Sequence, residues 1–162
     1  MPTNNHSPAV LVVDDEAQIR RFLRAGFELD GFLVHDAECG TDGIRSATVR
    51  PPDLVILDLA LPDIDGSEVL TRLRSWSNVP VIVLSVRSSE DEKVRLLQLG
   101  ADDYVVKPFG MAELLARSHA TAMMLVPVVH LEHALGTLLM VARGRELDRE
   151  DWRAFAHGVA TQ

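Results

Sequence analysis

The chain has 162 residues, of which 47% are hydrophobic and 25% charged, and its formal net charge is −8. This length fits one domain of ordinary size with an appendage, and the negative charge argues against a general nucleic-acid or anionic-membrane surface. No apolar run approaches the roughly 20 residues that cross a bilayer, and the single cysteine, Cys39, excludes an intrachain disulfide and suits a reducing, cytoplasmic location.

From Ala9 onward, short apolar runs alternate with amphipathic segments. The runs are continuously apolar, which is typical of strands buried on both faces of a parallel sheet. The amphipathic segments repeat at helical spacing, as Ile19, Leu23 and Phe27 do. We expect strands at 9–13, 32–35, 54–57, 79–84 and 104–106, and helices at 17–29, 41–47, 67–74, 90–99 and from about 111.

Strands that alternate with helices predict an α/β fold, a doubly wound five-stranded parallel sheet with helices on both faces. Binding sites in such folds lie beyond the carboxyl ends of the strands, where the strand order reverses. Residues 1–8 are expected to form a disordered tail and residues 9–117 the folded domain. Residues 118–162 depart from the pattern and are expected to form an atypical, short helical extension.

The strand ends carry polar residues with complementary chemistry. These residues are Asp14 and Asp15 after the first strand, Asp58 after the third, Ser85 after the fourth and Lys107 after the fifth. Crowded carboxylates repel one another, and a hard divalent cation such as Mg²⁺ relieves that repulsion. The Lys107 ammonium and the Ser85 hydroxyl suit phosphoryl oxygens. The set predicts a site for a metal-bound phosphoryl group, with one carboxylate as the nucleophile.

Several stretches of the chain resemble the receiver domain of two-component response regulators. They are Val12–Glu16, Leu57–Gly66 and Gly100–Phe109. The last stretch resembles the winged-helix (OmpR/PhoB) branch of the family, and Ser75–Ser85 most resembles its potassium-transport (Kdp-type) regulators. The likeness runs from about Ala9 to Arg117 without gaps. It implies a flavodoxin-like sheet with strand order 2-1-3-4-5.

The resemblance implies a phosphoacceptor switch rather than an enzyme. Asp58 would accept the phosphoryl group from a sensor histidine kinase, and Ser85 and Lys107 would hold the phosphoryl oxygens. The Mg²⁺ ligands that it implies are the side chains of Asp15 and Asp58, the backbone carbonyl of Ala60 and, through a bound water, Asp14. Ser85 and Tyr104 would form the switch that responds to phosphorylation. The Lys107–Pro108 peptide bond would be cis.

A second surface is implied to form a homodimer after phosphorylation. Its residues are Lys93, Val94, Leu97, Asp102, Asp103, Glu113 and Arg117. The apolar pair Val94 and Leu97 would lie at its centre, with ion pairs around it. A solvated charged face is the alternative, because exposed ion pairs contribute only about 0–1 kcal/mol each.

Other interpretations of the site remain open. A phosphohydrolase that uses an Asp nucleophile and Mg²⁺ usually has a second Asp two residues further on, where this chain has Ala60. A pseudo-receiver scaffold would lack some of the expected acidic and phosphate-contacting residues, all of which are present. Asp14 and Asp15 alone would fit an acidic pair at a helix N-terminus, and Tyr104 alone would fit a packed aromatic side chain.

The segment after Arg117 does not resemble a DNA-binding domain. It has 45 residues, with four basic side chains against five acidic ones. This balance is not the basic footprint of a phosphate-binding surface, so we expect no direct DNA binding from this chain. Helices are expected at 130–142 and 148–159, and His130 and His133 are expected to pack rather than to bind a metal.

Overall fold

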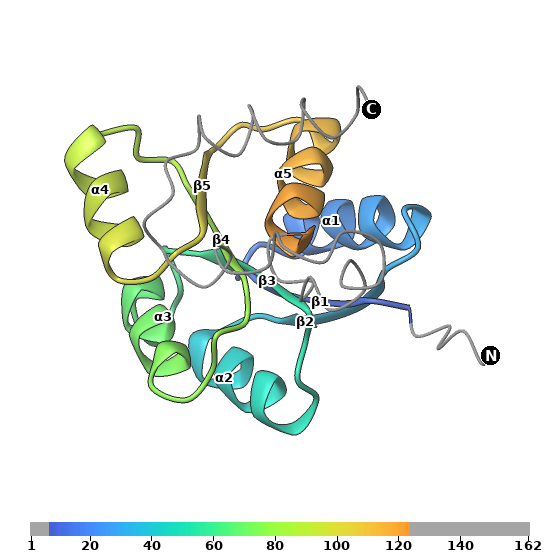
Figure 1. The fold of residues 1–162 in the computed structure, drawn as a ribbon, viewed down its shortest axis with the longest axis horizontal. Coiled ribbons are helices and arrows are strands. Elements are labelled where there is room, and N and C mark those ends of the chain that lie inside the picture. The colour runs from blue at the N-terminus through green and yellow to red at the C-terminus, as the bar shows by residue number, and fades with distance from the viewer. Residues whose placement is uncertain (1–6, 124–162) are drawn as a thin grey trace, which may run out of the picture. The chain divides into compact units, whose positions relative to one another are not determined.

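A parallel β-sheet forms the centre of the fold in the computed structural model, which describes residues 7–123. Within those residues the strands are β1 (Ala9–Val13), β2 (Leu33–Ala37), β3 (Leu54–Asp58), β4 (Val81–Ser85) and β5 (Asp103–Val106). Their order is β2-β1-β3-β4-β5, and each neighbouring pair is parallel. The doubly wound α/β class and the strand order 2-1-3-4-5 are therefore confirmed (Figure 1).

Helices follow the strands in alternation and cover both faces of the sheet (Figure 1). They are α1 (Ala17–Leu29), α2 (Gly40–Val49), α3 (Gly66–Arg74), α4 (Glu90–Gln98) and α5 (Met111–Met123). Helices α1 and α5 pack on one face, and α2, α3 and α4 pack on the other. Within residues 7–123, none of these helices is long and apolar enough to cross a membrane.

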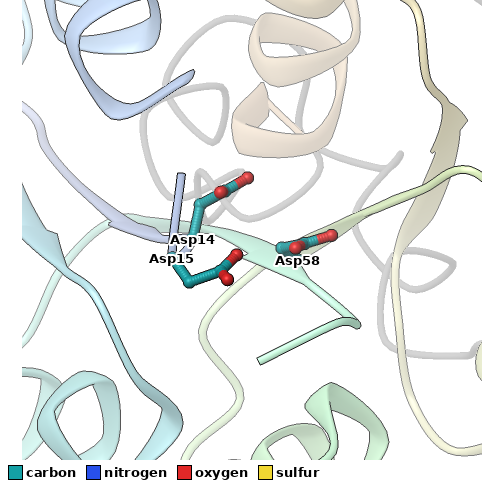
Figure 2. A group of neighbouring side chains, drawn as sticks. All are labelled: Asp14, Asp15 and Asp58. Atoms are coloured by element: carbon teal, nitrogen blue, oxygen red, sulfur yellow. The ribbon is translucent and has the colours of Figure 1, made fainter. Parts of the chain in front are cut away.

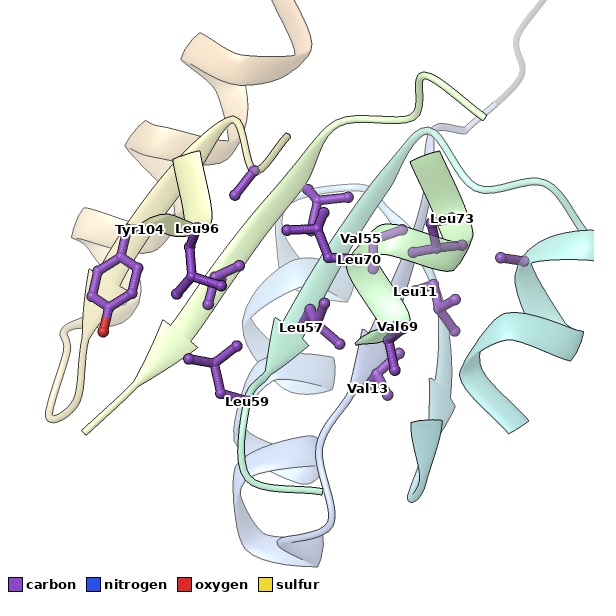
Figure 3. Packing of buried hydrophobic residues seen from close by; sticks show 14 of the residues in the cluster. Leu11, Val13, Val55, Leu57, Leu59, Val69, Leu70, Leu73, Leu96 and Tyr104 are labelled. Carbon is purple, nitrogen blue, oxygen red and sulfur yellow. The ribbon is translucent and has the colours of Figure 1, made fainter. Parts of the chain in front are cut away.

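The core has two layers, because side chains alternate between the two faces along each strand. On one face, Val13 and Leu57 belong to a cluster with Val69 of α3 (Figure 3). On the other face, Val12 belongs to a cluster with Phe27 of α1. Strands β1, β3 and β4 are buried along their whole length, which explains why their sequences are continuously apolar.

Several element boundaries differ from the prediction by one or two residues, and two of the differences in the strands have identifiable reasons. Strand β4 begins at Val81 rather than Val79, because the Val79 N–H donates to the Ser77 hydroxyl at 3.1 Å and Pro80 has no N–H to donate. Strand β2 extends to Ala37, whose carbonyl accepts the Asp14 N–H at 3.1 Å. The predicted stop of α4 is close to the observed one, since Gly100 has a φ of +110°.

Helix α2 also begins earlier than predicted, at Gly40, and its N-terminus is held from outside the helix. Asp63, in the loop between β3 and α3, accepts the N–H groups of Gly40 and Thr41, each at 2.8 Å. It also accepts the Thr41 hydroxyl at 2.7 Å. These bonds satisfy helix N–H groups that have no partner within the helix.

Helix α5 continues past Arg117 to Met123. Its last turns are packed against the domain, since Ser118 and Thr121 are buried and the Ser118 hydroxyl donates to the Leu114 carbonyl at 2.8 Å. Residues 1–6 of the tail expected at 1–8 lie outside the described residues, as do the helices expected at 130–142 and 148–159 and the pair His130 and His133. Pro8 is described, and its carbonyl accepts the Leu33 N–H at 2.9 Å.

Candidate functional site

The polar strand-end residues meet at one edge of the sheet. Asp14 follows β1, Asp58 and Ser85 are the last residues of β3 and β4, and Lys107 follows β5. The carboxyl ends of parallel strands share an edge, so these side chains converge although they are far apart in sequence. Figure 2 shows the three aspartate side chains gathered at the ends of β1 and β3.

Three carboxylates form the acidic part of the site. Oxygen atoms of Asp14, Asp15 and Asp58 all lie within 4.8 Å of one another. Asp14 and Asp58 are buried, whereas Asp15 is exposed. One Asp14 oxygen accepts the Glu16 N–H at 2.8 Å. Carboxylate oxygens at this spacing are the donor set that Mg²⁺ prefers, so the residues present fit a hard divalent cation.

Lys107 supplies the positive charge of the site. Its Nζ lies 3.1 Å from Asp14, 3.3 Å from Asp58 and 3.6 Å from Glu16. Burial by itself would lower the pKa of Lys107, but the charges of Asp14 and Asp58 outweigh burial and raise that pKa above its ordinary value. The ammonium is therefore held in its charged form. The Lys107–Pro108 peptide bond is cis, as the resemblance implies.

The surroundings of the Asp58 carboxyl disfavour its charged form, in contrast to those of Lys107. Its residue is only 4% exposed, and burial together with the nearby Asp14 charge raises its pKa above the ordinary 3.8, while Lys107 opposes that rise. The charged carboxylate is thus costly in the absence of further cations. A bound divalent cation would stabilise the ionised form that a nucleophile requires.

Gly66 fixes the backbone around Asp58. A Cβ at position 66 would lie 2.4 Å from the Asp58 carbonyl oxygen and 2.7 Å from the Leu59 Cα, which is closer than real Cβ atoms approach. The Gly66 N–H donates to the Leu59 carbonyl at 2.9 Å. Helix α3 can begin this close to the site only because residue 66 has no side chain.

Ser85 and Tyr104 both contact the backbone of Arg87, in the loop between β4 and α4. The Ser85 Oγ accepts the Arg87 N–H at 3.0 Å, and the Tyr104 hydroxyl donates to the Arg87 carbonyl. Ser85 and Tyr104 are both buried. The two residues implied to form the switch are therefore linked through one loop residue.

The site opens into a cavity of about 310 Å³ whose lining includes Asp15, Asp58, Ala60, Ser85 and Lys107. Sequence reasoning missed other lining residues, namely Glu16, Asp65, Arg87 and Glu92. Glu16 could have been found from the sequence, because it directly follows the paired aspartates. Arg87 and Glu92, which pair at 3.6 Å, could not, because the path of a loop is not encoded in strand or helix periodicity.

The structure also locates the residues of the implied dimer surface. Val94 and Leu97 of α4 are exposed. Arg117 pairs within the chain with Asp103 at 3.1 Å and with Glu113 at 3.0 Å. Asp102 pairs with Arg74 at 2.9 Å. All three acidic residues expected on this surface therefore already have partners inside one chain.

Comparisons with known sequences agree with this geometry. A family model for the response regulator receiver domain matches residues 10–119. The KDP operon transcriptional regulatory protein KdpE of Escherichia coli is 57% identical over 108 residues, which are 67% of this chain and 48% of that protein. The transcriptional regulatory protein PrrA of Mycobacterium bovis is 50% identical over 121 residues, 74% of this chain and 52% of that protein. The chain spans about half the length of the curated relatives it matches.

Solved structures share the fold. The receiver domain of the Francisella response regulator 1452 aligns with a TM-score of 0.69 and 34% identity, covering 72% of this chain and 97% of that one. The BeF3-activated N-terminal receiver domain of Klebsiella pneumoniae RstA aligns with a TM-score of 0.68 and 27% identity, covering 70% of this chain and 97% of that one.

Proposed function

Because the chain belongs to the response regulator receiver family, we propose that it is a phosphoacceptor switch in which Asp58 takes a phosphoryl group from a sensor histidine kinase. The observation that supports this most is the buried Asp58 carboxylate, 3.3 Å from the Lys107 ammonium and within a cluster of three aspartates. A nucleophilic carboxylate needs both a counter-charge for the incoming phosphoryl oxygens and donors for a metal ion, and this site offers both.

In the proposed reaction, an Asp58 oxygen attacks the phosphorus atom of a phosphohistidine. The new O–P bond forms as the P–N bond to the imidazole breaks, and the imidazole nitrogen keeps the electron pair of that bond. Mg²⁺, held by the side chains of Asp15 and Asp58, the Ala60 carbonyl and, through water, Asp14, would supply neutralising charge for the phosphoryl oxygens. The family resemblance implies this set of metal ligands.

Lys107 and Ser85 would hold the transferred group. The ammonium has three N–H donors and already faces Asp58, so it can turn from Asp14 and Asp58 toward a phosphoryl oxygen. The Ser85 hydroxyl accepts the Arg87 N–H, which leaves its own proton free for donation to a second phosphoryl oxygen.

The output would run through the loop residue that Ser85 and Tyr104 share. A shift of Ser85 toward the phosphoryl group would displace Arg87 through its N–H. The displacement would reach Tyr104 through its hydrogen bond to the Arg87 carbonyl. Tyr104 is buried, and the resemblance implies that this aromatic side chain turns inward when Ser85 moves toward the phosphoryl group. The surface of α4, β5 and α5 would then favour a homodimer centred on Val94 and Leu97.

The alternative of a phosphohydrolase gains no support from the site. Such an enzyme would need an acid–base carboxylate two residues beyond Asp58, where the structure has the exposed Ala60. The relatives are named as transcriptional regulators, and we propose that this chain shares their receiver function. Its cytoplasmic location, its kinase partner and its lack of direct DNA binding stay predictions.

Phosphorylation by a small donor tests the proposal. Incubation with acetyl phosphate and Mg²⁺ should add one hydroxylamine-labile phosphoryl group, visible by intact-mass spectrometry. Asp58→Asn should abolish this labelling, and Asp91→Asn, which changes an exposed aspartate of α4, should not. Full labelling of the Asp58→Asn variant would overturn the assignment of the nucleophile.

A further inference from the structure

Arg20, in the first turn of α1, donates hydrogen bonds to the backbone of both aspartates that follow β1. Its Nη1 donates to the Asp14 carbonyl at 2.8 Å and to the Asp15 carbonyl at 2.9 Å. The Arg20 side chain is only 14% exposed. Neither the sequence interpretation nor the proposed phosphoryl transfer gives this arginine a role.

The two carbonyls that Arg20 holds flank one residue. The Asp14 carbonyl lies in the peptide plane before Asp15, and the Asp15 carbonyl lies in the plane after it. The orientations of these two planes set φ and ψ of Asp15 and therefore the direction in which its side chain leaves the backbone. One guanidinium thus contacts both of the peptide planes that set the direction of the Asp15 Cα–Cβ bond.

Asp15 depends on this support more than its neighbours do. Within residues 7–123, the Asp15 carboxylate forms no hydrogen bond or ion pair, and the residue is exposed. Asp14, by contrast, is buried and is held by the Glu16 N–H and by Lys107. An exposed carboxylate without other contacts would lose both side-chain and backbone entropy on binding a metal. A backbone that is already fixed removes the backbone part of that cost.

The guanidinium is itself anchored at the end of β2. Its Nε lies 3.3 Å from Asp36, and its Nη2 lies 3.5 Å from Glu38. The planar fork of an arginine can reach carbonyls on one side and carboxylates on the other, which a single ammonium cannot do with the same geometry. The backbone of the Asp14–Asp15 pair is thereby tied to the sheet edge.

We propose that Arg20 is a positioning residue for metal binding: it holds the backbone of Asp14 and Asp15 so that the Asp15 carboxylate faces the cation site. This inference rests on the proposed function, because it assumes that the aspartate cluster binds Mg²⁺. Arg20 would touch neither the metal nor the phosphoryl group. Its loss would weaken Mg²⁺ binding without removing a ligand.

A positioning role and simple electrostatics predict opposite changes in Mg²⁺ affinity when Arg20 is replaced. A cation near a metal site repels Mg²⁺, so loss of the Arg20 charge alone would tighten binding. Loss of backbone support would weaken it, and removal of a group that orients metal ligands typically costs about 10–100-fold in affinity. Arg20→Gln therefore separates the two effects by the direction of the change.

The control is one helical turn away. Arg24 also pairs with Asp36, but it bonds the Val34 carbonyl and Glu28 rather than the Asp14–Asp15 backbone. Arg24→Gln removes the same charge from the same helix and leaves the aspartate carbonyls held. Arg20 also lines an open surface cavity of about 390 Å³, so its truncation enlarges that cavity rather than leaving a void in the core.

The experiment is a Mg²⁺ titration of the full chain at constant ionic strength, by calorimetry and by the rise in melting temperature. We expect about tenfold weaker binding for Arg20→Gln, nearly unchanged binding for Arg24→Gln, and an intermediate loss for Arg20→Lys. Melting in EDTA provides the folding control. If Arg20→Gln fails to fold, Arg20→Lys against wild type gives the same comparison with the charge kept.

The outcomes are distinguishable. If the wild-type protein does not respond to Mg²⁺, the proposed function fails first. If the wild type binds Mg²⁺ and Arg20→Gln binds it equally well or more tightly, the positioning role is wrong while the proposed function stands. Equal weakening in the Arg20→Gln and Arg24→Gln variants would also refute it, because the effect would then come from the pairing with Asp36 that both arginines share.

Discussion

The Lys107 ammonium lies 3.3 Å from a carboxylate oxygen of Asp58, at a site where both side chains are largely shielded from water. A buried charge is tolerated when it has a partner and becomes expensive when the partner is removed. The two residues come from different strands, so their pairing ties the end of β3 to the end of β5. The pair consequently affects both the stability of the fold and the chemistry of the site.

Removal of the ammonium should destabilise the metal-free protein. Lys107→Met leaves Asp14 and Asp58 buried without a cation, and we expect a loss of about 3 kcal/mol in the free energy of unfolding at pH 7 in EDTA. Urea denaturation measures it, with Lys93→Met as the control on α4. Added Mg²⁺ should recover part of the loss. Equal stability of Lys107→Met and wild type in EDTA would contradict this account of the pair.

A side chain at position 66 should disturb the site through the backbone. Gly66→Ala places a Cβ 2.4 Å from the Asp58 carbonyl oxygen, so helix α3 or the end of β3 must shift. We expect a cost of about 1–3 kcal/mol in unfolding free energy and slower labelling by acetyl phosphate. Gly110→Ala is the matched control, since nothing lies within 4 Å of its Cβ and its φ is not positive. If both variants are labelled at the same rate and have the same unfolding free energy, the close packing of Gly66 against the Asp58 carbonyl does not constrain the site.

The link from Asp63 to α2 should make stability depend on pH. The Thr41 hydroxyl and the N–H groups of Thr41 and Gly40 lower the pKa of Asp63 well below its ordinary 3.8. A lowered folded-state pKa contributes stability above the unfolded value, and this contribution is lost as the pH falls through the folded value. We therefore expect Asp63→Asn to melt at a lower temperature than wild type at pH 7, with the gap shrinking progressively below pH 3.8.

Asp42→Asn serves as the control for that comparison. Asp42 lies in the first turn of the same helix and pairs with the exposed Arg45. An exposed pair contributes little, so this variant should melt close to wild type across the same pH range. A constant gap between Asp63→Asn and wild type from pH 7 to pH 3 would show that the Asp63 charge is not responsible.

A charge on the outer side of α4 should block the proposed dimer. Val94 is 44% exposed, and Val94→Glu would place a carboxylate at the centre of the apolar contact. Sedimentation of the phosphorylated full chain should show a dimer for wild type and a monomer for Val94→Glu. Val49→Glu, at a valine of α2 that is 71% exposed, should still dimerise. A monomeric phosphorylated wild type would refute the dimer itself.

The ion pairs around that surface are expected to matter less. Arg117 already pairs with Asp103 and Glu113 in one chain, so a pairing across a dimer would exchange partners rather than add new ones. Such an exchange gives orientation more than affinity.

The fold and the core of the site were predictable from the sequence because both depend on strands. Continuous apolar runs identify β1, β3 and β4, and a parallel sheet brings the residues that follow them to one edge. The similarity to KdpE confirms the predicted likeness to potassium-transport regulators. The roles of all the site residues, including the nucleophile Asp58, the metal ligands and the switch residues, stay predictions.

The contacts made by loops and by single long side chains were not predictable in this way. The bonds from Asp63 to the start of α2 and from Arg20 to the Asp14–Asp15 backbone join segments whose spacing follows no helical or strand period. The same holds for Arg87, which becomes relevant only once the path of the β4–α4 loop is known. Such contacts depend on the assembled tertiary structure, and periodicity reports only local structure.

Asp14 and Lys107 are separated by 93 positions in the sequence, yet their side chains are in contact. During synthesis, the acidic cluster would therefore be exposed before its ammonium exists, and an incomplete chain would lack one of the groups that the proposed function assigns to the phosphoryl oxygens. Transient fraying of β5 would have the same effect as incomplete synthesis. Under the proposed function, the site would thus become complete only when the last strand of the sheet is in place.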